Sequence, residues 1–374
     1  MGVNIPQSLS VQAFTVVNGR PLFRIPLTNA SWVKELNAAG SLTVETAWCR
    51  ELAAVSPHET LQPWKVGLAL LHGDKVVQAG IITARKWDTQ TQSLSFTCKD
   101  LLELLDRRLV LNPGLINAWK DGVVSVDEEH PMGVWQSVYE GSLTDIATML
   151  VRDTLTWGSL PADLPEMTGG NNIRTYAAPD LCTIMEELEK LTSIQDGIEL
   201  LVDPYRDEHG YYRWRFRAET EICDHSWMFD TGHPGQKVIL SSIDEDTQNM
   251  TDQAFLTGGK NNDEILVARA YTSFLQNQGY PLLQVGDATH ATVSELPTLQ
   301  AYAEGLIQAG GRQAETYQLK ISADYPVSVG DHIRLRFNDP YAGRGQEDFK
   351  IVKISGDTSE WLSVDMKTLN ELYS

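Results

Sequence analysis

Two short stretches of the sequence bring together side chains that often do chemistry in proteins. The stretch "CDHSWMFDTGH" carries a thiol, carboxylates and imidazoles: Cys223, Asp224, His225, Asp230 and His233. The stretch "PVSVGDHIRLRF", from Pro326 to Phe337, places Asp331 and His332 side by side after a Val-Gly step. The first set could bind zinc or form a reactive thiol site, and the second could act as an acid and a base.

The spacing of these residues argues against both kinds of site. The first stretch matches no established spacing of zinc ligands, so we predict a polar loop between strands, with a zinc or thiol site as the alternative. In the second stretch we predict a turn at Val329–Asp331. A strand should follow, with three apolar side chains on one face: Ile333, Leu335 and Phe337. Neighbouring strand residues point to opposite faces, so the adjacent Asp and His cannot easily act on one substrate. We therefore predict no catalytic, metal-binding or cofactor-binding residue.

Two further patterns have a simpler explanation than a binding site. The stretch "TGGKNN", residues 257–262, lacks the Gly and Ser/Thr positions of a phosphate-binding loop, so we predict a turn. The stretch "YYRWRFR" mixes aromatic residues with arginines, as nucleic-acid-binding strands do. Its strict alternation also predicts a strand with the aromatic face toward a core: Tyr212, Trp214 and Phe216.

The composition is that of a folded, acidic chain. Its 374 residues are enough for two or three domains, and a hydrophobic content of 42% can build their cores. The formal net charge of −20 argues against wrapping nucleic acid, because phosphate binding needs clustered Lys and Arg. The four cysteines lie far apart, and neither an apolar run of about 18 residues nor a secretory signal occurs. We expect reduced thiols in a chain folded in a cytoplasm.

Hydrophobic periodicity predicts a β-rich first third, a mixed middle and a β-rich last third. In the first third we predict strands within 41–48, 64–87 and 93–100, and then a helix over 100–110. Arg107 and Arg108 would lie near the carbonyl end of that helix. In the middle we predict two helices, over 142–155 with Ser142 as N-cap and over 179–194 with Pro179 at its start. A hairpin over 197–218 should follow them. The last third should hold strands interrupted by a helix at 296–310.

The β-rich thirds share an order of parts. Both "SLSFTCKDL" and "EWLSVDMKTL" alternate and then run into a Lys and a Leu, which aligns three pairs: Phe96 with Val364, Cys98 with Met366, and Lys99 with Lys367. A chance match is the alternative, since strand periodicity forces much of the likeness. A true repeat would give one chain two copies of one β module. We predict a mainly β chain with an α+β part, divided into a first β module, an α+β module and a second β module: 1–112, 113–235 and 236–374, the last with a helix-containing insertion at about 275–313.

Three motifs in this order resemble a known family: the meander ending "SLSFTCKDLLELLDRRLV", the block "LTSIQDGIELLVDP" followed by "YRWRF", and the helix leading to "PVSVGDHIRLRF". They are similar to minor tail proteins of long-tailed bacteriophages, and more narrowly to the tail-tip or baseplate hub. The resemblance covers nearly the whole chain. It implies a trimer in which two similar β-barrel-like tail-tube modules per chain mimic a six-fold ring. Many hubs continue into a hydrolase or receptor-binding extension, whereas this sequence stops at Ser374, so such activity is expected from another protein.

The resemblance implies a structural virion protein and no enzyme. The trimer would adapt the six-fold tail tube to a three-fold tip, line or close the DNA channel, and contact the distal tail protein, the tape measure protein and tip or receptor-binding proteins. Genomic DNA would pass without specific binding, along a lining that we expect to be acidic. The chain would lie at the virion tail tip, without membrane insertion and without a cofactor. Alternatives are a hexameric distal tail protein, a contractile-injection hub and a tail-tip cell-wall hydrolase.

Partner contacts are expected in two long irregular segments, residues 107–141 and 271–296, because such segments in compact domains are often interfaces. Three aromatic residues in them are candidate anchors for a partner: Trp119, Trp135 and Tyr280. Packing into a core is the alternative for each of them.

Overall fold

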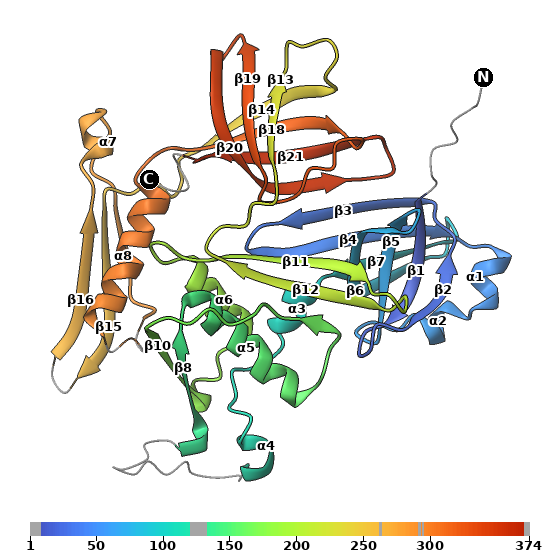
Figure 1. The fold of residues 1–374 in the computed structure, drawn as a ribbon, viewed down its shortest axis with the longest axis horizontal. Coiled ribbons are helices and arrows are strands. Elements are labelled where there is room, and N and C mark those ends of the chain that lie inside the picture. Colours follow the sequence, from blue (N-terminus) through green and yellow to red (C-terminus); the bar gives the residue numbers. More distant parts are fainter. Residues whose placement is uncertain (1–8, 120–132, 262–263, 291–292, 294, 370–374) are drawn as a thin grey trace. The chain divides into compact units, whose positions relative to one another are not determined.

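The computed structural model describes residues 9–119, 133–261, 264–290, 293 and 295–369 (Figure 1). They form two compact units, each built from several segments of the chain. The first unit holds Met1–Glu189, Glu199–Glu219 and Ser355–Glu360, and the second holds Lys190–Ile198, Thr220–Ile354 and Trp361–Ser374. The predicted division at 112 and 235 stays a prediction, because one compact unit can contain more than one domain.

The first unit contains an antiparallel β module made of the chain's first strands: β1 (Leu9–Thr15), β2 (Pro21–Ile25), β3 (Asn29–Glu35), β4 (Ala38–Ala47), β5 (Val66–His72), β6 (Lys75–Asp88) and β7 (Ser93–Lys99). Their order across the sheet is β3-β4-β7-β6-β5-β1-β2, and its consecutive antiparallel neighbours β5, β6 and β7 confirm the predicted meander. Short helices α1 (Arg50–Ala54) and α2 (Pro57–Thr60) join β4 to β5, and α3 (Leu101–Leu105) follows β7.

The second unit contains a corresponding β module: β13 (Ser226–Asp230), β14 (Val238–Asp246), β18 (Ala314–Ser322), β19 (His332–Asp339), β20 (Gly343–Gly356) and β21 (Trp361–Thr368). Their order is β14-β18-β21-β20-β19-β13. The paths of described strands are open in both units and close no barrel. The predicted mainly β class with α+β parts is confirmed, although the term barrel-like claims more closure than the strand pairing shows.

The two modules repeat one arrangement down to the residue register. Strands β3-β4-β7-β6-β5-β1 occupy the same order as β14-β18-β21-β20-β19-β13. Cys98 lies opposite Leu42 and Phe96 opposite Val44, just as Met366 lies opposite Tyr317 and Val364 opposite Leu319. All these side chains are buried. The repeat seen in the sequence is therefore a structural repeat. It breaks at the last pair, since β1 runs antiparallel to β5 whereas β13 runs parallel to β19.

Between these modules the chain forms helices and small sheets: α4 (Leu115–Ala118), the 3₁₀ helix η1 (Gly133–Trp135), β8 (Gln136–Gly141), α5 (Leu143–Trp157), β9 (Ala162–Asp163), β10 (Asn172–Ala177), η2 (Ala178–Asp180) and α6 (Ile184–Thr192). The predicted N-cap of α5 is confirmed. The Ser142 hydroxyl accepts from the Asp145 backbone N–H at 3.1 Å, and the Asp145 carboxylate accepts from the Ser142 backbone N–H at 3.3 Å.

The predicted hairpin consists of β11 (Glu199–Arg206) and β12 (Tyr212–Glu219), and its aromatic face is buried as expected. It packs against the first β module. The Tyr212 backbone N–H donates to the Gly19 carbonyl at 2.7 Å, and the rings of Tyr212 and Phe14 lie 4.8 Å apart. The aromatic–arginine alternation thus serves packing within the first unit.

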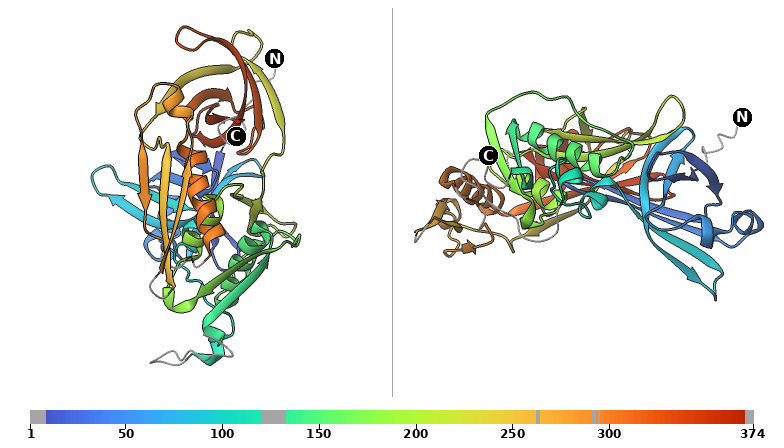
Figure 2. Two further views of the ribbon diagram at one scale, coloured as in Figure 1. Left: turned by 90° about the vertical axis from the view of Figure 1, so that its left-hand side faces the viewer. Right: turned by 90° about the horizontal axis from the view of Figure 1, so that it is seen from below.

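The second unit also contains a small sheet and its helices: β15 (Gln253–Asn261), β16 (Glu264–Tyr271), α7 (Phe274–Asn277), β17 (Gln284–Asp287) and α8 (Leu296–Gly310). The sheet order is β16-β15-β17, and α8 packs along β15 and β16 (Figures 1 and 2). Buried Leu299 and Ala303 confirm the predicted apolar face of α8. In the described part of the chain, no helix has the length and apolar character needed to cross a membrane.

Several local predictions were wrong. The stretch "TGGKNN" belongs largely to β15, where a bulge between Thr257 and Lys260 accommodates the glycines. The stretch "CDHSWMFDTGH" is not all loop, because β13 runs through it. The helix expected from Pro179 begins only at Ile184, and Leu181, within the range predicted as helix, is 60% exposed.

The role of Arg108 also differs from the prediction. The helix over 100–110 ends at Leu105, so the arginine does not cap that helix. Its guanidinium instead donates to the carbonyl oxygens of Thr154 and Gly158, at 3.0 and 2.8 Å, where α5 ends. These bonds satisfy carbonyl groups that the last turn of α5 leaves without helical partners.

Asp100, the N-cap of α3, gives the first unit a pH dependence. Its carboxylate is buried and accepts from the backbone N–H groups of Gly40 and Leu102, at 2.6 and 3.0 Å. Burial raises the pKa of this carboxyl to about 7. Folding therefore favours its protonated form, and this contribution to stability is present below about pH 4, the ordinary aspartate pKa, and is lost as the pH rises to 7. We expect wild type to lose stability relative to Asp100→Asn between about pH 4 and 7 in urea unfolding. A constant difference across this range would contradict the assignment.

Candidate interaction surfaces

The two predicted tryptophan anchors lie against each other in the first unit. The ring centroids of Trp119 and Trp135 are 4.9 Å apart, and Trp119 is 52% exposed. Asn112 holds their segments together, because its amide donates to the Gln136 carbonyl at 2.9 Å and its oxygen accepts from the Gly114 N–H at 2.8 Å. Residues 120–132 of the predicted interface segment lie outside the described residues.

The third predicted anchor, Tyr280, belongs to the second unit. It is 39% exposed, and its hydroxyl donates to the Gln313 side-chain oxygen at 3.3 Å. The structure thus joins two of the three predicted residues into one aromatic pair, in which Trp119 is exposed and Trp135 partly buried, and leaves the third elsewhere. Their role as partner anchors stays a prediction.

A further exposed aromatic pair was not predicted. Trp48 follows β4 and Trp87 is the next-to-last residue of β6, and their rings meet edge to face with centroids 5.3 Å apart. They line an open pocket of about 670 Å³ with Leu94, Pro57 and neighbouring residues. The signal was present in the sequence, since both tryptophans stand at strand ends, but only the pairing of β4 and β6 with β7 shows that these ends are adjacent.

Arg85 holds the α2 side of the pocket in place. This guanidinium donates to the carbonyl oxygens of Pro57, His58 and Leu61, at 3.1, 2.9 and 3.1 Å. It thereby anchors the short helix α2 against β6. The pocket is thus a fixed feature of the first unit, with apolar walls and a half-exposed tryptophan pair.

The adjacent Asp and His that suggested catalysis have structural roles. Asp331 is fully buried, and its carboxylate accepts from the His225 N–H at 3.0 Å, the Trp227 indole N–H at 2.8 Å and the Ser328 N–H at 2.9 Å. These bonds attach the start of β13 to the start of β19. A buried carboxylate saturated by fixed donors is poorly placed to take a proton from a substrate.

His332 points to a different partner, as its place in the strand predicts. Its Nε2 lies 2.8 Å from a Glu221 carboxylate oxygen, and the ammonium of Lys350 lies 3.6 Å from the same oxygen. Lys350 is fully buried, so the acid compensates a charge that could not be buried alone. The predicted buried strand face, Ile333, Leu335 and Phe337, is confirmed.

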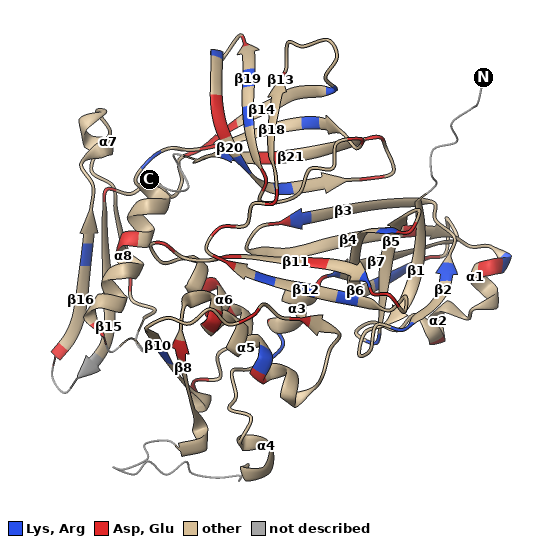
Figure 3. Cartoon of the chain, in the orientation of Figure 1, with Lys and Arg blue, Asp and Glu red and all other residues tan. Residues whose placement is uncertain are grey.

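The thiol in this region is not activated. Burial raises the pKa of the Cys223 thiol above its ordinary value, which lowers its thiolate fraction at neutral pH. Among the residues that the structure describes, no three His, Cys, Asp or Glu side chains are grouped to hold a metal ion. Figure 3 shows Asp and Glu interspersed with Lys and Arg along the described strands and loops.

No protein-family model and no curated protein matches the sequence. Solved structures do match. The 43 kDa tail protein of prophage MuSo2 from Shewanella oneidensis is 11% identical, with a TM-score of 0.58 over 98% of this chain and 100% of that chain. The tail protein from Neisseria meningitidis MC58 is 10% identical, with a TM-score of 0.57 over 98% and 99%. Prophage tail protein gp18 from Listeria monocytogenes EGD-e is 8% identical, with a TM-score of 0.51 over 96% and 94%. The chain therefore has the fold of phage tail proteins, as the sequence motifs predicted.

Proposed function

We propose that the protein is a structural component of a phage tail, a trimeric hub at the distal end that adapts the six-fold tail tube to a three-fold tip. The observation that carries the proposal is the internal repeat, in which two modules of one strand order and register occur in one chain. Three such chains around an axis present six similar modules, which can match a six-fold ring while keeping three-fold symmetry. The phage tail protein fold over nearly the whole chain supports the same role.

The proposal extends to partners and to the channel. The trimer would contact the distal tail protein, the tape measure protein and tip proteins, with the Trp119–Trp135 pair and Tyr280 as anchors. Genomic DNA would pass through it without specific binding, which a net charge of −20 favours if acidic residues line the channel. A neutral or basic lining, with the acids on the outer surface, would contradict that last point.

We propose no catalytic role for this chain. The support is that its most suggestive acid and histidine have structural partners: Asp331 attaches the start of β13 to the start of β19, and the Nε2 of His332 lies 2.8 Å from a carboxylate oxygen of Glu221. A tail-tip hydrolase is the remaining alternative of another class. Clearing of host cell wall in a zymogram by the purified chain, lost on substitution of one acid, would favour that alternative.

The mass of the purified chain in solution separates the structural alternatives. A hub trimer has about 125 kDa, three times the 41.7 kDa of one chain. We expect this mass by light scattering over a hundredfold range of concentration. A hexamer of about 250 kDa would favour the distal tail protein instead, and a monomer throughout would contradict both assemblies.

A further inference from the structure

Two small sheets, one in each unit, share a design that leaves one face uncovered. In each sheet one face packs on a helix, β8 on α5 and β15–β16 on α8. The opposite face exposes apolar side chains on alternate residues of β16 in the second unit, and at Val138 of β8 and Ile173 of β10 in the first unit. Alternation normally gives a polar face to water, so an apolar outer face indicates a surface that becomes covered.

The outer face of the sheet in the second unit, which we call the basic face, centres on β16. Ile265, Val267 and Tyr271 are 51%, 56% and 67% exposed, while the alternate residues Ala268 and Ala270 are buried. Phe255 of β15, 36% exposed, adds a second aromatic ring to the face. The face is thus apolar over two neighbouring strands.

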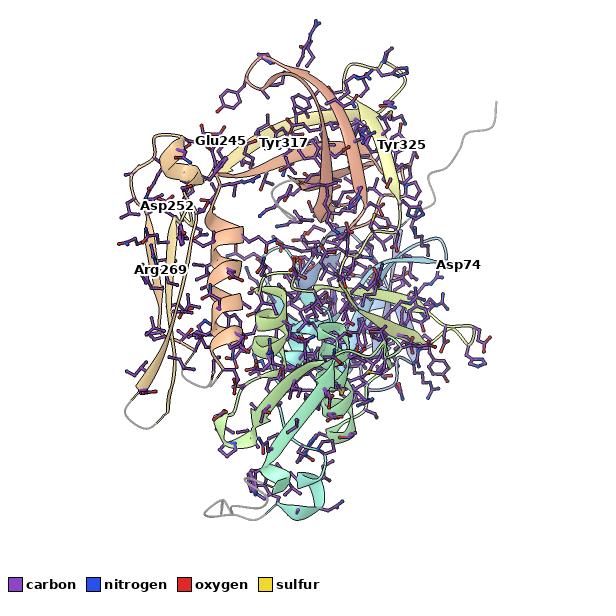
Figure 4. The ribbon with its side chains drawn as sticks, turned by 60° about the vertical axis from the view of Figure 1, so that its left-hand side comes forward. Asp74, Glu245, Asp252, Arg269, Tyr317 and Tyr325 are labelled. Carbon is purple, nitrogen blue, oxygen red and sulfur yellow. The ribbon has the colours of Figure 1, made fainter. Side chains whose placement is uncertain are left out.

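The basic face carries a positive charge at its centre. The guanidinium of Arg269 lies over the rings of Tyr271 and Phe255, at 4.9 and 5.7 Å from their centroids. Figure 4 shows Arg269 on this sheet. Stacking holds an arginine in place while leaving its planar group free to pair with a carboxylate.

The outer face of the sheet in the first unit, the acidic face, has the complementary character. Val138 and Ile173 are 59% and 57% exposed on β8 and β10, and Glu140 lies directly opposite Ile173 in the antiparallel register. Thr175, opposite Val138, is also exposed. Tyr139 points the other way, where its hydroxyl donates to Asp153 of α5 at 2.8 Å. The face therefore combines two exposed apolar, β-branched side chains with polar ones, and has a carboxylate in place of the guanidinium.

We propose that the basic face of one copy of the chain binds the acidic face of the next copy, with Arg269 paired to Glu140. The charges have opposite sign, both surfaces are apolar sheet faces, and one chain carries one of each. A contact between two different faces repeats from copy to copy and closes into a ring when the rotation allows it. This inference rests on the proposed trimer and names the surfaces that hold it together.

Disulfide trapping tests the contact directly. In a chain with Cys49, Cys182 and Cys223 replaced by serine, Val138→Cys with Val267→Cys should give dimers and trimers of the chain on mild oxidation. The matched control pairs Val267→Cys with Val17→Cys, a valine that is 65% exposed on neither face, and should remain monomeric on a denaturing gel. Equal cross-linking in both variants, or none in the first, would overturn the inference.

Charge reversal adds a readout that does not depend on cysteines. Glu140→Arg and Arg269→Glu should each weaken self-association at least about tenfold, since each places like charges together, and the double variant should recover most of the loss. Glu208→Arg, in an exposed turn, should leave the self-association of the chain unchanged. Circular dichroism of each variant separates a lost contact from a lost fold. A trimer indifferent to all these changes would overturn the inference and leave the hub proposal standing, whereas a wild-type monomer would overturn both.

Discussion

Replacing Asp331 by alanine is expected to lower the free energy of unfolding of the second unit by about 4 kcal/mol. The change removes one buried acceptor and leaves three partly buried donors without that partner: the N–H groups of His225 and Ser328 and the indole of Trp227. Each buried donor left unpaired costs about 1–3 kcal/mol, and the losses within one network are not additive. Urea unfolding measures the effect, in the transition that belongs to the second unit.

The control for this change lies on the neighbouring strand. Asp348 pairs with Arg334 at 2.7 Å, but both side chains are about half exposed. Because exposed ion pairs contribute little, Asp348→Ala should have a much smaller effect than Asp331→Ala. Equal effects of the two alanines would show that Asp331 is not the attachment point between β13 and β19. The conservative Asp331→Asn keeps one acceptor and should fall between wild type and alanine.

Gly19→Ala should destabilise the first unit by about 3 kcal/mol or more. Gly19 has a φ of +68°, and a Cβ added there would lie 1.8 Å from the carbonyl oxygen of Tyr212. A left-handed backbone costs an L-residue about 1–2 kcal/mol, and the clash with β12 adds to it because backbone cannot move aside cheaply. The docking of β12 on β1 should loosen, since Gly19 also accepts the Tyr212 N–H.

Gly169→Ala separates the two parts of this cost. Gly169 has a φ of +83°, yet nothing lies within 4 Å of an added Cβ. The control therefore carries the backbone strain without the clash and should cost about 1 kcal/mol. Thermal unfolding of both variants measures the difference. Melting temperatures lowered equally would mean that the close approach of β12 to Gly19 is not a constraint on the fold.

The strands and their buried faces were predictable because alternation is a local property. Ile333, Leu335 and Phe337 are buried as their spacing predicts, and so is the aromatic face of β12. The internal repeat could also be found from the sequence, since equivalent strands keep the same alternation and the same terminal lysine. What the sequence could not supply was the order of the strands, which depends on pairing between distant segments.

The turn at Asp331 could be predicted from the sequence, but the partners of its carboxylate could not. Its turn and the opposite orientation of His332 followed from local rules, but its partner Trp227 lies 104 residues earlier in the chain. The Trp48–Trp87 pair was missed for the same reason, because the adjacency of two strand ends arises only in the folded sheet. Arg108 was assigned to its own helix, and its real partners on α5 are about 50 residues away.

The predictions for the start of α6 and for the stretch "TGGKNN" were wrong for a different reason. There a local signal was overruled by its surroundings, since Pro179 is the second residue of a 3₁₀ turn that Leu181 ends with a left-handed backbone. The glycines at 258–259 are accommodated by a bulge in β15 rather than by a turn. At both places the residue propensities correctly indicated a change of chain direction. They predicted a helix start and a turn, where the structure has a 3₁₀ turn and a β-bulge.

An electron cryo-microscopy reconstruction of the purified full-length assembly is the most direct test of the proposed trimeric hub. We expect three copies around one axis, with the β1–β7 module and the β13–β21 module alternating to form a ring of six similar sheets. The two kinds of module should superimpose on each other after a rotation of about 60° around that axis. An assembly in which only one of the two modules surrounds the axis would contradict the proposed trimeric hub.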